Sequence, residues 1–271
     1  MMSDARGKSF STFVSWIIQR HNGDILASTS GYGILKIINN RAIKLDHGIY
    51  HSIHYVNRIA EDHQQRLWIL TEDQGLLCVN HNRITHYFSG SGHTASVRDI
   101  CIDPHNNIYV VVRGQGLFKM CNNDNVFHHI AEVKANNLET IYMTRSGMIY
   151  LGTDGHGICV YNPFTHVVRD NPFFCWGMDL SKSKIQSVIE DCNGNLWIGM
   201  LQKGVFMQRA HRLPFNYMGY RLGKANVIGS NSVSAVLFDH HNRLWVGTDK
   251  DGLYLLDNQK HLLRHYDRNV P

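Results

Sequence analysis

The sequence is poor in charged residues and has no long hydrophobic run. Of its 271 residues only 18% are charged, whereas 43% are hydrophobic. A disordered chain needs the opposite balance, so we expect a folded globular protein. No apolar run approaches the roughly 18 residues that a membrane-spanning helix requires. The sequence therefore predicts no membrane segment in this chain.

The sequence also lacks the common metal-binding and catalytic motifs. Its six cysteines form no CxxC pair, and we expect them to be small buried hydrophobic residues. HExxH, the GxSxG nucleophile motif and the phosphate-binding glycine loops are absent. Three histidine pairs fall in expected loops, turns or outer strands: His51/His54, His128/His129 and His240/His241. The sequence thus predicts no metal, no cofactor and no catalytic residue.

Positive charge is spread thinly along the chain. The net charge of +5 comes from single Lys and Arg residues, with no block of like charge. Nucleic-acid-binding regions gather such residues into patches or stripes. We therefore expect no nucleic acid contact by this region.

What the sequence does contain is an internal repeat. Residues 191–200 read DCNGNLWIGM and residues 239–248 read DHHNRLWVGT. Alignment on the Leu-Trp pair gives six copies, centred on Leu26, Trp68, Tyr109, Tyr150, Trp197 and Trp245. The centres are 42, 41, 41, 47 and 48 residues apart. Repeats of this length indicate a repeat architecture.

Three columns of this alignment are invariant in character. Twelve residues before the centres stand Val14, Val56, Val97, Leu138, Ile185 and Val233, and nine before stand Ile17, Ile59, Ile100, Ile141, Val188 and Val236. Seven residues after them stand Gly33, Gly75, Gly116, Gly157, Gly204 and Gly252. We expect the aliphatic pair on a buried strand, and the glycine where the backbone needs a positive φ or a close approach.

Each repeat predicts four antiparallel strands. The aliphatic strand leads into a polar turn, where an acid such as Asp191 can hold the hairpin by accepting backbone N–H bonds. The Leu-Trp strand, a loop ending at the glycine, a third strand and a more polar fourth strand come next. Four strands per 41–48 residues predict an all-β fold, a β-propeller with six visible blades across residues 1–271. A sandwich or solenoid fits this repeat less well.

The same reasoning explains the N-terminus. Residues 1–20 have a basic start and a short apolar patch, but the patch is interrupted and no small-residue cleavage site comes after it. The patch at residues 13–18 is predicted to be the first strand of the first blade, and not a signal peptide.

With these phrases in view, the repeat resembles the two-component regulator propeller repeat. The family's phrase is an acid, a turn, Leu-Trp-Ile-Gly-Thr and then Gly-Leu, and the match is sharpest at residues 185–207 and 233–257. It weakens in the first blade, where Ile-Leu-Ala-Ser-Thr replaces the Trp phrase. Residues 228–233, IGSNSV, are similar to the spacer that precedes such a repeat.

The resemblance implies a function. Such propellers form the periplasmic sensor half of hybrid two-component system histidine kinases that detect oligosaccharides released from polysaccharides. It implies that this chain is no enzyme and signals to a kinase absent from it. The six repeats are expected to be an incomplete seven-bladed propeller, or a second propeller starts after about residues 210–230. A periplasmic location is implied, and a cytoplasmic one if the chain is a complete reading frame without a signal peptide.

We predict that the ligand binds on one rim of the propeller. The loops from second to third strand, and from fourth strand to the next blade, converge there around a rigid scaffold. Oligosaccharides need planar polar groups for their hydroxyls and aromatic rings for their apolar faces. The predicted ligand-binding residues are Tyr32, Tyr50, Gln74, Arg113, Gln115, Asp154, His156, Trp176, Gln202, Lys203, Asp249 and Asp251.

Two other functions stay open at this point. A propeller lyase or hydrolase acting on a glycan or macrocycle would place His and acid side chains together at the axis mouth. A protein-interaction scaffold would need only the large surface. Beyond an oligosaccharide or other small ligand, the expected partners are a second copy of the chain or a neighbouring propeller.

Overall fold

The computed structural model separates into two compact units, Met1–Ala210 and His211–Pro271. It describes residues 2–3, 9–39, 41–45, 48–90, 93–135, 137–170, 180–210, 227–229 and 232–267. Regular structure in these residues is almost entirely β, with two short 3-10 turns, η1 (Gly48–Tyr50) and η2 (Leu180–Lys182). None of the described helical segments has the length and hydrophobicity to cross a bilayer. The predicted all-β class is confirmed.

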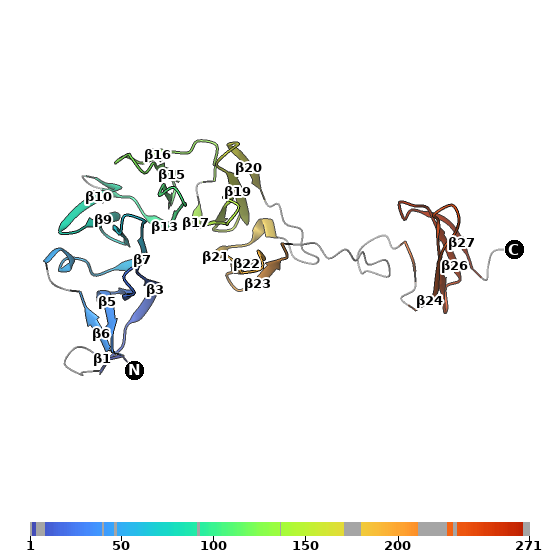
Figure 1. Ribbon diagram of the computed structural model, residues 1–271, viewed down its shortest axis with the longest axis horizontal. Coiled ribbons are helices and arrows are strands. Elements are labelled where there is room, and N and C mark those ends of the chain that lie inside the picture. Colours follow the sequence, from blue (N-terminus) through green and yellow to red (C-terminus); the bar gives the residue numbers. More distant parts are fainter. Residues whose placement is uncertain are drawn as a thin grey trace. The chain divides into compact units, whose positions relative to one another are not determined.

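The first unit contains five antiparallel sheets in chain order, which we call blades one to five (Figure 1). Blade one comprises β3 (Phe13–Gln19), β4 (Ile25–Ser30), β5 (Gly33–Ile38) and β6 (Arg41–Lys44). Blade two comprises β7 (Val56–Glu61), β8 (Leu67–Thr71), β9 (Leu76–Asn80) and β10 (Arg83–Tyr87). Blade three comprises β13 (Val97–Ile102), β14 (Ile108–Val112), β15 (Gly116–Met120) and β16 (His128–His129). Blade four comprises β17 (Leu138–Met143), β18 (Ile149–Thr153), β19 (Ile158–Asn162) and β20 (Val167–Asp170).

Blade five has three described strands. They are β21 (Ile185–Glu190), β22 (Leu196–Met200) and β23 (Gly204–Gln208). Two small hairpins add to the unit: β1 (Met2–Ser3) with β2 (Ser9–Phe10), and β11 (Ser89–Gly90) with β12 (His93–Thr94). Four-stranded blades are thus confirmed for blades one to four. The prediction that the patch at residues 13–18 opens blade one is confirmed by β3.

The first strands form the inner edge of this unit. The first strands β3, β7, β13, β17 and β21 follow one another along this edge, while the fourth strands of blades two to four lie outside and are largely exposed (Figure 1). The core fills the interfaces between blades, because each sheet is apolar on both faces. Between blades two and three, for example, Trp68 and Leu70 pack with Val97 and Ile100. The repeat therefore recurs because every blade presents the same face to its neighbour.

The side chains at the repeat centres test this packing. Trp68 is fully buried and Tyr109 is 2% exposed, and both belong to the cores between neighbouring blades. Trp197 is 40% exposed instead. It belongs to blade five, and in the described part of its unit no further sheet covers that face. The close packing seen at Trp68 and Tyr109 is therefore not repeated at Trp197.

An acid in the first hairpin turn binds the Trp of the same blade. In blade five, Asp191 accepts the backbone N–H groups of Asn193 and Asn195 and the indole N–H of Trp197, each at 2.9 Å. Asp62 in blade two accepts an indole N–H from Trp68 at 2.9 Å in the same way. The predicted hairpin role of these acids is confirmed. The indole bond also explains why the acid and the Trp occur together.

Asp191 makes stability depend on pH. The hydrogen bond from Trp197 and those from Asn195 lower the pKa of Asp191 from its ordinary 3.8 to about 2. Because the folded value lies below the unfolded one, this stabilisation is present above about pH 4 and disappears as the pH falls through about 2. We expect the difference in urea midpoint between the natural protein and Asp191→Asn to shrink over this range. Tryptophan fluorescence would monitor the unfolding, and a pH-independent difference would contradict the assignment.

The second unit is described over residues 227–229 and 232–267. It holds one antiparallel sheet, blade six, made of β24 (Val233–Phe238), β25 (Leu244–Thr248), β26 (Leu253–Leu256) and β27 (Leu262–Tyr266). Ile228, Leu244, Val246, Tyr254 and Leu256 form its small core. All of β24 is exposed, whereas the equivalent strands of blades two to four bury their aliphatic pair. Whether these residues begin a second propeller stays a prediction.

Candidate ligand-binding rim

A β-bulge recurs at one step of the first strand in every blade. The strand register shifts between Val56 and Arg58, and between Val97 and Asp99, directly after the first aliphatic residue of the repeat. The same shift occurs in the other four blades. Bulges re-aim side chains and occur near binding sites. Here the bulge falls at the two variable positions between the aliphatic residues of the repeat, which are residues 57 and 58 in blade two and residues 98 and 99 in blade three.

The second of these positions carries a buried polar chain through blades two, three and four. Arg58 forms an ion pair with Asp99, whose side chain is only 2% exposed. Asp99 also accepts the Thr140 hydroxyl at 2.8 Å and the Ile141 backbone N–H at 3.0 Å. Arg58 in turn lies over the ring of Trp16, 3.7 Å from its centroid. Blades one to four are thereby joined along their inner strands.

The first of these positions contributes to an exposed cluster, which we call the charged rim. It consists of Arg98, Arg113, Glu139, Asp154 and Lys184. Arg98 contacts Glu139 at 2.5 Å and Lys184 contacts Asp154 at 2.8 Å. Arg113 lies 3.7 Å from each of these carboxylates. The Lys184 hydrogen bond is the main cause that lowers the pKa of Asp154, so this acid is an anion at neutral pH.

A pocket of about 580 Å³ adjoins the charged rim on blade four. Its lining includes Lys134, Asn137, His156, Cys159 and Asp170. The Asn137 amide donates to the Asp154 carbonyl oxygen at 2.9 Å and contacts His156 Nδ1 at 2.8 Å, so it forms the wall between pocket and rim. Burial raises the pKa of Cys159 to about 12, which keeps it a neutral thiol and no nucleophile. The lining is mixed, because Val133, Ala135 and Val168 stand among these polar groups.

The structure brings part of the predicted site together. Arg113 and Asp154 meet in the charged rim, and His156 lines the adjoining pocket. Lys203 lies on the equivalent loop of blade five, where its ammonium contacts the Ser183 hydroxyl at 3.2 Å. Gln115 and Gln202 are exposed on the same loops.

The remaining predicted residues lie elsewhere. Tyr32 is exposed on the loop of blade one, and the Gln74 amide donates to the Ser52 carbonyl at 2.9 Å. Tyr50 is half-buried and lines a different pocket with the hairpin-turn residues Arg20 and Gln64, so it does not join the charged rim. Trp176 lies outside the described residues. Asp249 and Asp251 belong to the second unit, where Asp251 accepts the hydroxyl of Tyr254.

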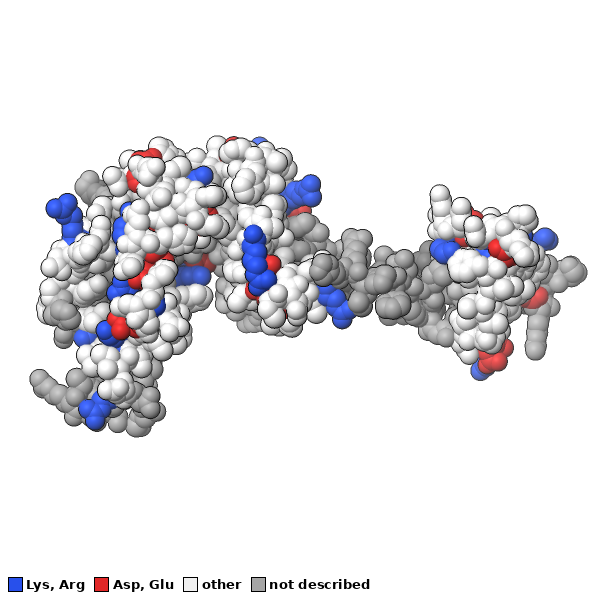
Figure 2. Space-filling view, viewed as in Figure 1, with Lys and Arg blue, Asp and Glu red and all other residues white. Residues whose placement is uncertain are grey.

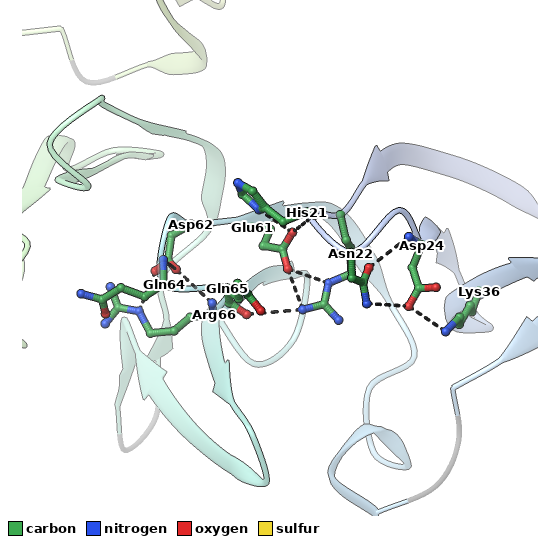
Figure 3. Close-up of polar contacts among 10 residues, drawn as sticks. His21, Asn22, Asp24, Lys36, Glu61, Asp62, Gln64, Gln65 and Arg66 are labelled. Atoms are coloured by element: carbon green, nitrogen blue, oxygen red, sulfur yellow. Dashed lines mark hydrogen bonds and ion pairs between the residues drawn. The ribbon is translucent and has the colours of Figure 1, made fainter.

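The opposite end of blades one and two carries a second polar network. Glu61 accepts the side chain of Arg20 at 2.8 Å and both the backbone N–H and the ring of His21, at 2.7 and 2.9 Å (Figure 3). Asp24 pairs with Lys36 at 2.7 Å within blade one. Every carboxylate there is matched by a neighbouring donor. This network fastens one blade to the next and leaves the charged rim as the candidate site.

Sequence reasoning missed the inner-strand members of the site. Arg58, Arg98, Asp99 and Glu139 all stand between the two invariant aliphatic residues of their blades. Variation at two positions inside a fixed frame is the signal that could have found them. Figure 2 shows acidic and basic side chains intermixed on the described part of one face, with no broad area of one sign.

Residues 228–250 match a family model described as two component regulator propeller. This segment contains β25, the strand that carries the Leu-Trp phrase of blade six. No curated protein sequence gives a significant match. The resemblance to this family is thus confirmed at that segment, and the sheet order agrees with the predicted propeller class.

Solved structures share the fold of this chain. The extracellular domain of a B. thetaiotaomicron protein described as a hybrid two component system is 18% identical, with a TM-score of 0.57, covering 97% of this chain and 34% of its own. PorZ, a surface component of the type-IX secretion system of Porphyromonas gingivalis, is 16% identical, with a TM-score of 0.58. The alignment covers 97% of this chain and 43% of PorZ. A streptogramin B lyase is 11% identical, with a TM-score of 0.53. The alignment covers 96% of this chain and 86% of the lyase. At these identities the likeness concerns the fold, and the chain spans less than half of the first two structures.

Proposed function

We propose that the first unit is the ligand-binding part of a periplasmic sensor of the hybrid two-component type, and that its ligand is an oligosaccharide. The observation that carries the proposal is the pocket of about 580 Å³ on blade four beside the charged rim. Its volume lies in the range of small-molecule sites. Its amide, imidazole and charged groups are the kinds of group that bind sugar hydroxyls.

The fold also offers a means of passing on occupancy. The buried chain from Arg58 through Asp99 to Thr140 joins the inner strands of blades two to four. A ligand that contacts blades three and four would therefore act on a connected body and not on a loose loop. Such a body can move as a unit against a second copy or a neighbouring propeller. A histidine kinase is the proposed recipient of that movement.

Isothermal titration against a panel of neutral and acidic oligosaccharides tests the proposal. We expect Asn137→Ala to weaken binding of the active saccharide about 10-fold or more, because it removes a hydrogen-bonding wall of the pocket. Asn80→Ala is the matched control, since Asn80 also bonds a histidine, His81, at 2.7 Å, but on blade two. No binding across the panel, or an equal loss in both variants, would count against the proposed site.

A further inference from the structure

Arg113 is a cation with unused binding capacity. Its backbone N–H donates to the Ser96 carbonyl at 2.9 Å, which fixes the loop after β14. Its side chain is 54% exposed, and its closest charged contacts are Glu139 and Asp154, each at 3.7 Å. Such separations are beyond hydrogen-bond range. The guanidinium thus makes no side-chain hydrogen bond to the described residues, although it carries five N–H donors.

The two carboxylates nearest to Arg113 are already engaged by other cations. Arg98 Nε donates to Glu139 at 2.7 Å, and Lys184 reaches Asp154 at 2.8 Å. The charged rim therefore holds three cations and only two carboxylates, with Arg113 as the third cation. Its net charge is +1. Lys203, on the equivalent loop of blade five, contacts a neutral hydroxyl. An anionic acceptor for Arg113 is what this arrangement lacks.

An oxyanion matches this deficit. A guanidinium presents parallel N–H groups that bind a carboxylate or sulfate through two hydrogen bonds, a geometry that an ammonium does not offer. The pocket beside the rim would hold the rest of the molecule, within the same unit. We propose that Arg113 determines specificity by binding a carboxylate or sulfate group of an acidic saccharide. This inference rests on the function proposed above, because the saccharide occupies the same site.

A purely structural role for Arg113 makes a different prediction. In that case Arg113 would only balance Glu139 and Asp154, and its removal would lower stability without changing the choice of ligand. The acids keep Arg98 and Lys184 as partners in an Arg113 variant. We therefore expect the urea midpoint of Arg113→Ala to stay close to that of the natural protein, and the effect to fall on binding.

The test is isothermal titration of the full chain with three probes. Trigalacturonate carries carboxylates, its methyl ester is the neutral match, and a sulfated galactose disaccharide carries the other oxyanion. We expect one acidic probe to bind about 10- to 100-fold more tightly than the ester, as charge-assisted hydrogen bonds imply. Which of the two binds identifies the oxyanion. Arg113→Ala should abolish this preference and leave the affinity for the ester unchanged.

Two further variants make the result unambiguous. Arg83→Ala removes an exposed arginine of β10 on blade two and should keep the preference. Arg113→Gln keeps a long polar side chain, so it replaces Arg113→Ala if that variant fails to fold. An ester that binds as tightly as the acids overturns the role of Arg113 while the proposed saccharide site stands. Silence of all three probes, together with silence of the wider panel, overturns both.

Discussion

Asp99→Ala is expected to lower the free energy of unfolding by about 3–5 kcal/mol, the usual cost of breaking a buried ion pair on one side. Asp99 has almost no solvent exposure and joins Arg58 on blade two to Thr140 and Ile141 on blade four. Its removal leaves a partly buried guanidinium and a buried N–H without their acceptor. Urea unfolding monitored by circular dichroism measures the loss.

Two comparisons separate the ion pair from simple loss of packing. Asp99→Asn keeps an oxygen that can accept from Thr140, so we expect a smaller loss than with alanine. Arg58→Met combined with Asp99→Ala removes both charges, and should be less destabilised than the sum of the two single changes. Additive losses, or an Asp99→Ala variant within about 0.5 kcal/mol of the natural protein, would show that the chain through Asp99 does not hold the blades together.

The sequence could not reveal this series of side-chain contacts because its members share no residue type. Trp16, Arg58, Asp99 and Thr140 stand at one repeat position, yet they are an aromatic, a cation, an anion and a hydroxyl. Their relation exists only once the bulge turns each inner strand toward the next. Repetition identifies what every blade does alike, which is packing. It does not show which side chains of one blade contact those of the next.

Features that act within one blade were predictable for the same reason. The acid, the Trp and the polar turn between them recur within one hairpin, and the structure joins them through the carboxylate of Asp191. The loop residues Arg113 and Asp154 could be named as candidates because the flanking glycine and strands recur, and the structure places the two side chains 3.7 Å apart. Tyr50 lies in a segment outside the repeat frame, so the repeat could not predict that it lines a different pocket. The exposure of Trp197 depends on whether another sheet packs against blade five, and no single repeat encodes its neighbour.

Gly33→Ala is expected to destabilise the first unit well beyond the cost of backbone strain alone. Gly33 has a φ of +74°, and an added Cβ would lie 2.2 Å from the Ile53 carbonyl oxygen in the segment that leads into blade two. Gly204 stands at the same repeat position in blade five with the same φ, but nothing lies within 4 Å of its Cβ direction. Left-handed strain costs an alanine about 1–2 kcal/mol at either site.

The difference between these two glycines therefore isolates the close approach between neighbouring blades. We expect Gly33→Ala to lose about 1–3 kcal/mol more than Gly204→Ala in urea unfolding, because backbone must shift to admit the methyl group. Equal losses would mean that the glycine column serves only the conformation of its own loop. A larger loss at Gly33 would mean that this glycine also sets how closely the segment before blade two can lie against blade one.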